Sequence, residues 1–95
     1  MEYLEKALNL ARKHGFRIVH DCAYEEIYFG ERPHSFLEFE GVLSHVVEFH
    51  SLSKMFNITG WRLAFAVGSP QHLAPLKVMK TNMAAGQIKL LQLMA

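Results

Sequence analysis

Residues 46–67 read VVEFHSLSKMFNITGWRLAFAV, and this stretch decides the fold. It begins with an apolar, β-prone run over 46–50 and ends with another over 63–67. Both runs are apolar enough to form strands that are buried on both faces of a sheet. The residues between them, 51–62, carry hydroxyls, an amine and a guanidinium. We therefore expect two buried strands whose connection holds chemically active side chains.

The residues before this stretch predict a helix and one more strand. Over residues 2–14, apolar side chains recur three and four positions apart with charged ones opposite them, which indicates an amphipathic helix. Gly15 is suited to ending that helix in the left-handed conformation. A β-prone run over 16–20 follows and is expected to end near Asp21.

The segment between the first two strands determines how they pair. Residues 25–41 hold glycines and a proline among mixed side chains, which predicts an irregular crossover with one turn of helix after Ser35. A crossover of this length allows the first two strands to be parallel. If the third strand runs antiparallel, Arg62 enters at the same edge of the sheet as the ends of the first two. The fold class is therefore α/β, with a three-stranded, mixed and mostly parallel sheet and flanking helices.

The last third of the chain predicts helices. Ser69 and Pro70 suit an N-cap and a first helical position, whereas Pro75 removes a backbone hydrogen bond and predicts that a new helix begins there. Apolar side chains continue through Ile88 to Met94 without a cap or a polar tail. We expect residues 1–95 to be one fragment of a larger domain, cut inside a helix, with no second domain present.

Composition excludes several classes of protein. The chain has 95 residues, 51% hydrophobic and 20% charged, which is typical of one globular unit. Ten Lys+Arg against nine Asp+Glu give a formal net charge of +1, so we expect neither nucleic acid nor a membrane as a partner. The single cysteine, Cys22, fits a reducing compartment, and no apolar run reaches the ~20 residues that span a bilayer. A cytoplasmic location is expected.

Three short motifs stand at strand ends: Asp21-Cys22-Ala23-Tyr24, Ser51-Leu52-Ser53-Lys54 and Gly60-Trp61-Arg62. The expected topology brings all three to one edge of the sheet, where open α/β sheets bind ligands. A carboxylate, a phenol, two hydroxyls, an amine and a guanidinium suit a phosphorylated aromatic aldehyde with a basic ring nitrogen. Pyridoxal phosphate is the obvious member of that class.

Each group suits one part of this cofactor. The amine of Lys54 can condense with the aldehyde. Arg62 can bind the phosphate through two hydrogen bonds, helped by the two serine hydroxyls. Asp21 can keep the pyridine nitrogen protonated, which makes the ring an electron sink, and Tyr24 can hydrogen-bond the phenolic oxygen.

Residues 49–62, together with Asp21 and Tyr24 upstream, resemble the class I/II aminotransferases of fold type I, and are most similar to the LL-diaminopimelate and alanine branch. The resemblance extends to 80–82 and 86–87 and corresponds to an internal part of the family's large, pyridoxal-phosphate-binding domain. It implies an enzyme that moves an amino group between an amino acid and a 2-oxo acid. LL-diaminopimelate with 2-oxoglutarate is the first expectation, and an alanine- or aspartate-type reaction is the alternative. The full-length parent is expected to be a homodimer.

The resemblance also implies the roles of individual residues. Lys54 is the catalytic residue that bonds to the cofactor and later moves the proton of the substrate. The implied cofactor-binding set is Asp21, Tyr24, Ser51, Ser53, Lys54 and Arg62. The family's glycine-rich phosphate turn, the aromatic side chain that stacks on the cofactor ring and the arginine that binds the substrate carboxylate are not found in these 95 residues. We therefore expect the isolated fragment to be inactive.

Other interpretations remain open. No metal is expected, because the six histidines show no ligand spacing, and Cys22 beside a carboxylate is expected to be a buried, inert thiol. The run 51–54 also satisfies the Ser-x-x-Lys signature of penicillin-recognising acylases, although 57–60 disfavour the long helix which that chemistry needs. A catalytically incompetent structural or dimerising fragment is the alternative outside enzymology.

Overall fold

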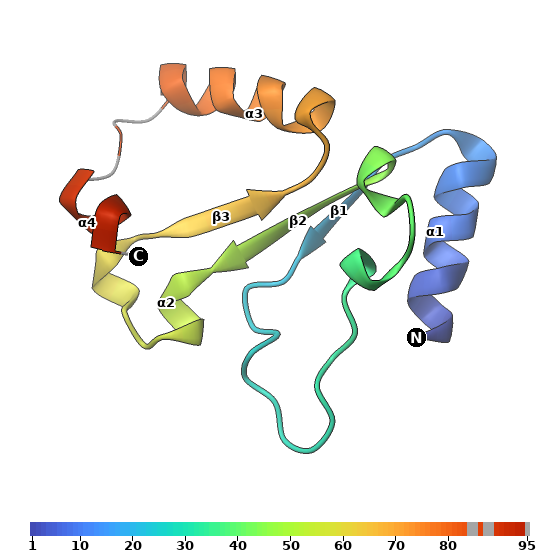
Figure 1. Ribbon diagram of the computed structural model, residues 1–95, viewed down its shortest axis with the longest axis horizontal. Coiled ribbons are helices and arrows are strands. Elements are labelled where there is room, and N and C mark those ends of the chain that lie inside the picture. The colour runs from blue at the N-terminus through green and yellow to red at the C-terminus, as the bar shows by residue number, and fades with distance from the viewer. Residues whose placement is uncertain (84–85, 87–88, 95) are drawn as a thin grey trace.

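The computed structural model describes residues 1–83, 86 and 89–94 (Figure 1). In these residues, strands and α-helices are joined in places by single turns of 3-10 helix. The elements are α1 (Glu2–His14), β1 (Ile18–Asp21), η1 (Phe36–Glu38), η2 (Val42–Ser44), β2 (Val46–Ser51), α2 (Leu52–Met55), η3 (Thr59–Trp61), β3 (Ala64–Val67), α3 (Pro70–Met83) and α4 (Lys89–Met94).

The sheet has the predicted mixed topology. Its strand order is β1-β2-β3, with β1 parallel to β2 and β3 antiparallel to β2. In this register Asp21 lies opposite Phe49, and Ser51 lies opposite Ala64. The ends of β1 and β2 and the start of β3 therefore meet at one edge of the sheet (Figure 1). The α/β fold class with a three-stranded mixed sheet is confirmed.

The core lies between α1, the crossover and β2. Leu8 of α1, Phe36, Val42 and Val46 form a buried apolar cluster, each at most 3% exposed. The predicted end of α1 is also observed, because Gly15 has φ of 71° and its N–H donates to the carbonyl of Ala11 at 2.8 Å. The amphipathic pattern of residues 2–14 is thus explained by burial of one face of the helix.

The crossover contains the expected turn of helix after Ser35. The Ser35 hydroxyl accepts from the backbone N–H of Leu37 at 2.9 Å, and Glu38 Oε1 accepts from the backbone N–H of Ser35 at 2.8 Å, which is a capping box. A second single turn, η2, was not predicted. Both turns lead the chain back to the start of β2, which makes the parallel pairing possible.

The predicted helix break at Pro75 is wrong. Helix α3 begins at Pro70 as expected, with the Ser69 carbonyl accepting from the N–H groups of His72 and Leu73 at 3.0 Å, but it continues through Pro75 to Met83. Because proline has no backbone N–H, the helical hydrogen bond from position 75 to the carbonyl of Gln71 is absent. Pro75 and Gln71 are both exposed, so water can hydrogen-bond to that carbonyl and the helix continues past the proline.

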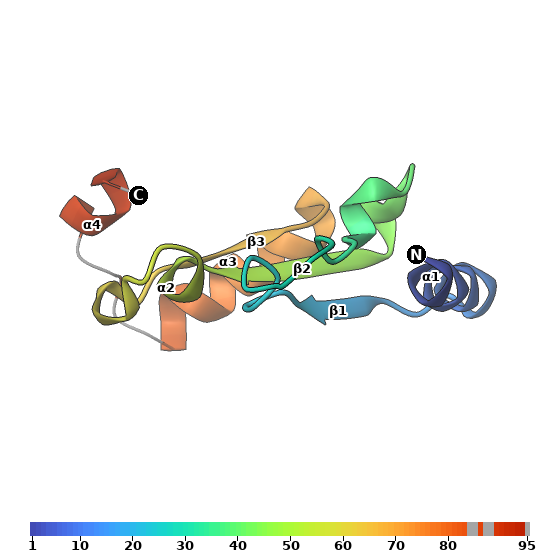
Figure 2. The ribbon, with the colours of Figure 1, turned by 90° about the horizontal axis from the view of Figure 1, so that it is seen from below.

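The molecule is thin along one axis. Figure 2 shows the sheet close to edge-on, with α1 at one end of the molecule and α4 at the other, and the chain forms a slab of 41 × 37 × 18 Å. The predicted C-terminal helix is observed in part as α4, while Gln87 and Ile88 lie outside the described residues. Within the described part of the chain, no helix has the length and apolar character needed to cross a bilayer.

Candidate cofactor-binding site

A cavity of about 330 Å³ opens at the edge where β1 and β2 end and β3 begins. All six side chains that the sequence predicted for one site line this cavity, together with three apolar neighbours. The lining residues are Asp21, Ala23, Tyr24, Ser51, Ser53, Lys54, Arg62, Leu63 and Ala64.

Backbone hydrogen bonds beyond the strand ends bring these segments together. The N–H of Cys22 donates to the carbonyl of Phe49 at 2.8 Å, which continues the parallel pairing past β1. The N–H of Leu52 donates to the carbonyl of Leu63 at 3.2 Å, which continues the antiparallel pairing past β2. The first bond fixes the turn after Asp21, and the second draws the start of α2 toward the start of β3.

Lys54 and Tyr24 contact each other across this edge. Lys54 lies on the single-turn helix α2 and is half-buried, and its Nζ lies 5.6 Å from the centre of the Tyr24 ring. This is within the range of a cation–π contact. The contact places the amine and the phenol, which come from different strand ends, beside the same space.

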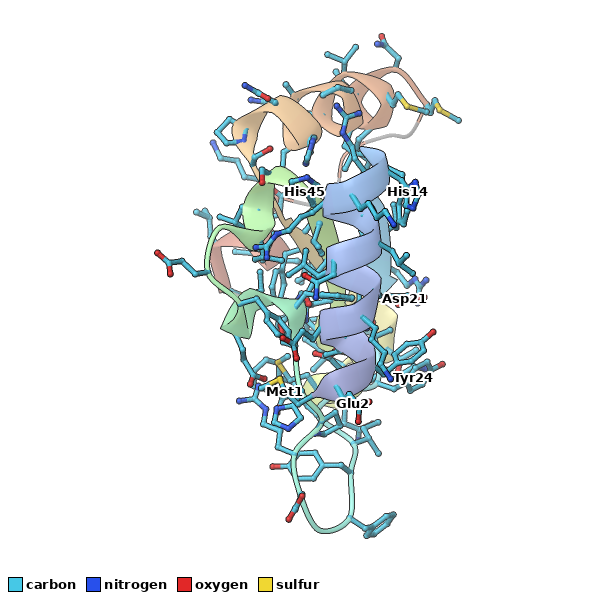
Figure 3. The ribbon with its side chains drawn as sticks, turned by 90° about the vertical axis from the view of Figure 1, so that its right-hand side faces the viewer. Met1, Glu2, His14, Asp21, Tyr24 and His45 are labelled. Carbon is cyan, nitrogen blue, oxygen red and sulfur yellow. The ribbon has the colours of Figure 1, made fainter. Side chains whose placement is uncertain are left out.

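Asp21 has a structural role as well as a place in the cavity. Its Oδ1 accepts from the backbone N–H of Ala23 at 3.2 Å, which is an Asx turn at the end of β1. The residue is exposed, so its carboxylate remains accessible to a ligand. Figure 3 shows Asp21 and Tyr24 along the same side of the molecule.

Arg62 has a strained backbone. Its φ of 54° and ψ of 42° are left-handed, a conformation that costs a residue with a Cβ roughly 1–2 kcal/mol. The side chain folds back far enough for Nη1 to donate to the carbonyl of Thr59 at 3.4 Å. Strain of this kind gathers at functional sites, and here it occurs at a residue that lines the edge cavity together with Lys54.

The two serines lie on either side of the junction between β2 and α2. Ser51 ends β2 and stands at the N-cap position of α2, yet its hydroxyl makes no capping bond to that helix. Ser53 is 6% exposed, and its carbonyl accepts from the N–H of Ile58 at 3.1 Å. Since Ser51 belongs to a strand and α2 has only one turn, the long Ser-x-x-Lys helix of the acylase alternative is not formed.

Sequence reasoning missed a buried polar cluster behind this site. Glu48, at the centre of β2, is 0% exposed and accepts hydrogen bonds from Ser35, from the backbone of Phe36 and from His20. Burial alone raises the pKa of this carboxyl, but the hydrogen bonds from His20, Ser35 and Phe36 outweigh it and hold the pKa of Glu48 below its ordinary value. A glutamate inside an otherwise apolar strand was the available signal.

Cys22 belongs to the same cluster and is the buried thiol that was expected. It is 4% exposed, and burial, together with the nearby carboxylates of Glu25, Glu48 and Asp21, raises its pKa. Possible metal-ligand atoms lie within 4.8 Å of one another in two sets that share this thiol. The sets are His20, Cys22 and Glu48, and Cys22, Glu25 and His50.

The edge cavity fits pyridoxal phosphate in size and in donor set. Its volume of about 330 Å³ falls in the range of small-molecule sites. It combines an acid, a phenol, two hydroxyls, an amine and a guanidinium. A larger hollow of about 520 Å³ lies between α3 and β3, but the side chains that line it are mainly apolar, so it lacks that combination.

A model of the family "Aminotransferase class I and II" matches residues 1–95. The chain belongs to this aminotransferase family. Members of the family depend on pyridoxal phosphate, so the donor set at the sheet edge and the family's cofactor agree.

Curated relatives of this aminotransferase chain include two bacterial enzymes named LL-diaminopimelate aminotransferase. The one from Syntrophobacter fumaroxidans is 47% identical over 92 residues, and the one from Oleidesulfovibrio alaskensis is 45% identical over 92 residues. These matches cover 96% and 95% of the chain. The chain spans about a quarter of the length of each relative, 24% in both cases.

Solved structures show the same fold. An aminotransferase from Staphylococcus aureus matches 96% of the chain with a TM-score of 0.86 and 34% identity, and substrate-bound BacF from Bacillus subtilis matches 96% with 0.85 and 35%. A probable N-succinyldiaminopimelate aminotransferase from Thermus thermophilus matches 90% with 0.79 and 45%. The chain covers 24%, 23% and 23% of these structures, respectively.

Proposed function

We propose that residues 1–95 form part of the cofactor-binding domain of a pyridoxal-phosphate-dependent aminotransferase, and that the cavity at the sheet edge is its cofactor site. The observation that supports this most is the meeting of six chemically matched side chains, drawn from three separate segments, around one cavity. Taken singly, an aspartate or a serine at a strand end is a turn former, as Asp21 indeed is. The combination has no such explanation.

Each polar group of the cavity binds a different part of the cofactor. Arg62, with the hydroxyls of Ser51 and Ser53, binds the phosphate, because a guanidinium presents paired donors to phosphate oxygens. Asp21 holds a proton at the ring nitrogen through a charge-assisted hydrogen bond. When bound, pyridoxal phosphate supplies an electron sink for a carbanion at the substrate's α-carbon.

Lys54 supplies the reactive amine. Its amine would hold the cofactor through the aldehyde and would carry the proton to and from the substrate's α-carbon. The Tyr24 ring, which lies 5.6 Å from the Lys54 amine, helps to position that amine, and its hydroxyl would hydrogen-bond the phenolic oxygen of the cofactor. An amine held in this way meets a bound substrate without first being ordered.

The proposed substrates are an amino acid and a 2-oxo acid. LL-diaminopimelate with 2-oxoglutarate is favoured, because relatives that carry the name LL-diaminopimelate aminotransferase are 42–47% identical to this chain. An alanine- or aspartate-type reaction is the alternative. We further propose that the complete enzyme is a cytoplasmic homodimer.

Trapping with borohydride tests the cofactor site. Pyridoxal phosphate is added to the 95-residue chain, and to a complete enzyme that carries it, and reduction then fixes the cofactor on the amine to which it is bound. Peptide mapping should find the label on Lys54, and Lys54→Arg should lose it. Lys77, Lys80 and Lys89 serve as internal controls, and label spread evenly over them would contradict the proposal.

A structural, catalytically incompetent unit is the second candidate. The slab is only 18 Å thick along its short axis, and side chains such as Val19 and Phe29 are 72% and 102% exposed, which favours a surface that meets other polypeptide. This candidate predicts stable self-association with no selective labelling of Lys54. Selective labelling in the complete enzyme would exclude it.

A further inference from the structure

We propose that Glu48 is a positioning residue, which holds the turn that carries Asp21 and Tyr24 in its working geometry through His20 and Cys22. This inference rests on the proposed cofactor site. Glu48 itself does not line the cavity. It is the buried centre of the polar cluster on the other side of that turn.

Glu48 ties three segments together. Its Oε1 accepts from the N–H of Phe36 at 2.8 Å and from His20 Nδ1 at 3.1 Å, and the Ser35 hydroxyl lies 2.9 Å from Oε1 and 2.8 Å from Oε2. His50 Nε2 lies 3.2 Å from Oε2, without the alignment of a hydrogen bond. The crossover, β1 and β2 are thus joined at one buried carboxylate, and removing its charge weakens each of these charge-assisted hydrogen bonds.

The cluster continues from His20 into the turn. His20 Nδ1 lies 3.0 Å from Cys22 Sγ and 3.9 Å from Glu25 Oε1, and the Cys22 thiol donates to the carbonyl of His20 at 3.7 Å. Cys22 is 4% exposed, and the Glu25 side chain is 16% exposed. These two residues therefore anchor the turn from its buried side.

The same turn presents the site residues on its other side. Asp21 and Tyr24 are exposed and line the cavity, whereas Cys22 and Glu25 point into the cluster. The N–H of Glu25 donates to the carbonyl of Cys22 at 3.4 Å and closes the turn, so a shift of its buried residues moves the backbone of its exposed ones. If the contact between Glu48 and His20 is lost, Cys22 is released, and the carboxylate and phenol directed at the cofactor lose their alignment.

The cluster does not need a metal ion to be satisfied. Glu48 already accepts from Ser35, Phe36 and His20, so its oxygens are in use. Cys22 is buried beside the carboxylates of Glu25 and Glu48, which favours the neutral thiol over the thiolate that a metal would bind. Co²⁺ added to the apoenzyme should therefore give no thiolate-to-metal absorption band.

The test compares Glu48→Gln with Ser35→Ala in a complete enzyme that carries this chain. Both variants remove a hydrogen bond at the buried carboxylate, but only Glu48→Gln weakens the link to His20. We expect Glu48→Gln to weaken pyridoxal phosphate binding at least about tenfold and to change the circular dichroism of the bound cofactor. Ser35→Ala should leave both readouts close to wild type, within about twofold in affinity.

Cys22→Ala provides the second variant if Glu48→Gln does not fold. It cuts the last contact before the turn and leaves the bonds of Glu48 intact, and it should also weaken cofactor binding and alter the dichroism. Unchanged affinity and dichroism in either folded variant, an equal loss in Ser35→Ala, or a Co²⁺ band would overturn the inference. Failure of wild type to bind pyridoxal phosphate would instead overturn the proposed function.

Discussion

At the scale of single residues, Arg62 combines a strained backbone with a place at the site. Because φ is 54°, an alanine there keeps the strain and a glycine releases it. We expect Arg62→Gly to have a free energy of unfolding about 0.5–1 kcal/mol above that of Arg62→Ala. Both variants should lose affinity for pyridoxal phosphate. Urea unfolding and cofactor titration measure the two effects, and equal stability of the variants would contradict the strain.

The Cys22 thiol makes stability depend on alkaline pH. Burial raises its pKa above the ordinary value of 9.0, so the unfolded chain loses this proton before the folded chain does. The stabilising contribution is complete below about pH 9 and falls as pH rises, by at most about 1.4 kcal/mol per pH unit. Urea unfolding between about pH 8 and 10 should show a steeper decline for wild type than for Cys22→Ala. Parallel declines would show that the thiol is not responsible.

Single residues also show what the sequence could and could not predict. Asp21, Lys54 and Arg62 were identified because each stands in a motif beside a strand end, and the topology brings those ends together. Glu48 was overlooked because its partners, Ser35 and His20, are 13 and 28 positions away. The spacing of these residues along the chain gives no indication of such contacts, because the contacts form only when the crossover folds.

At the scale of elements, α3 tolerates a proline in its interior. Pro75 is exposed and removes one backbone bond, whereas Pro70 occupies the first helical position, where its ring costs nothing. We expect Pro75→Ala to raise the free energy of unfolding by about 1–3 kcal/mol, and Pro70→Ala to give no such gain. Urea unfolding of both variants measures this, and equal effects would show that Pro75 does not strain α3.

Elements were predictable where one local signal dominated. The helix over 2–14 followed from its periodicity, and all three strands from their apolar runs, with ends displaced by one or two residues. The continuity of α3 through Pro75 was not predictable in this way. It depends on the exposure of Gln71 and Pro75, which is a property of the folded molecule and not of the local sequence.

At the scale of the whole molecule, the chain exposes more surface than a closed domain of its mass. Its accessible surface is 7240 Å², whereas scaling for folded monomers of 10.9 kDa gives about 5600 Å². Its radius of gyration is 14.9 Å, against about 12 Å for a compact domain of this length. The excess includes the apolar hollow between α3 and β3, which Met79 and Met83 line.

We expect the isolated chain to self-associate through that hollow. Met79 and Met83 are 54% and 77% exposed, so replacing both with lysine should shift sedimentation toward monomer without removing buried packing. Leu10→Lys is the matched control, because Leu10 is 52% exposed but lies on α1. Sedimentation velocity distinguishes the variants, and a monomeric wild type would contradict the expectation.

The antiparallel pairing of β3 with β2 places part of the site within one continuous segment of the chain. Lys54 and Arg62 are eight positions apart in the connection between β2 and β3. Asp21 lies at the same edge, but the long crossover between β1 and β2 separates it from them along the chain. The spacing between amine and guanidinium is thus encoded locally. A cyclic peptide built from residues 46–67 would keep the amine and the guanidinium that bind an anionic aldehyde, but it would lack the acid that activates the aldehyde.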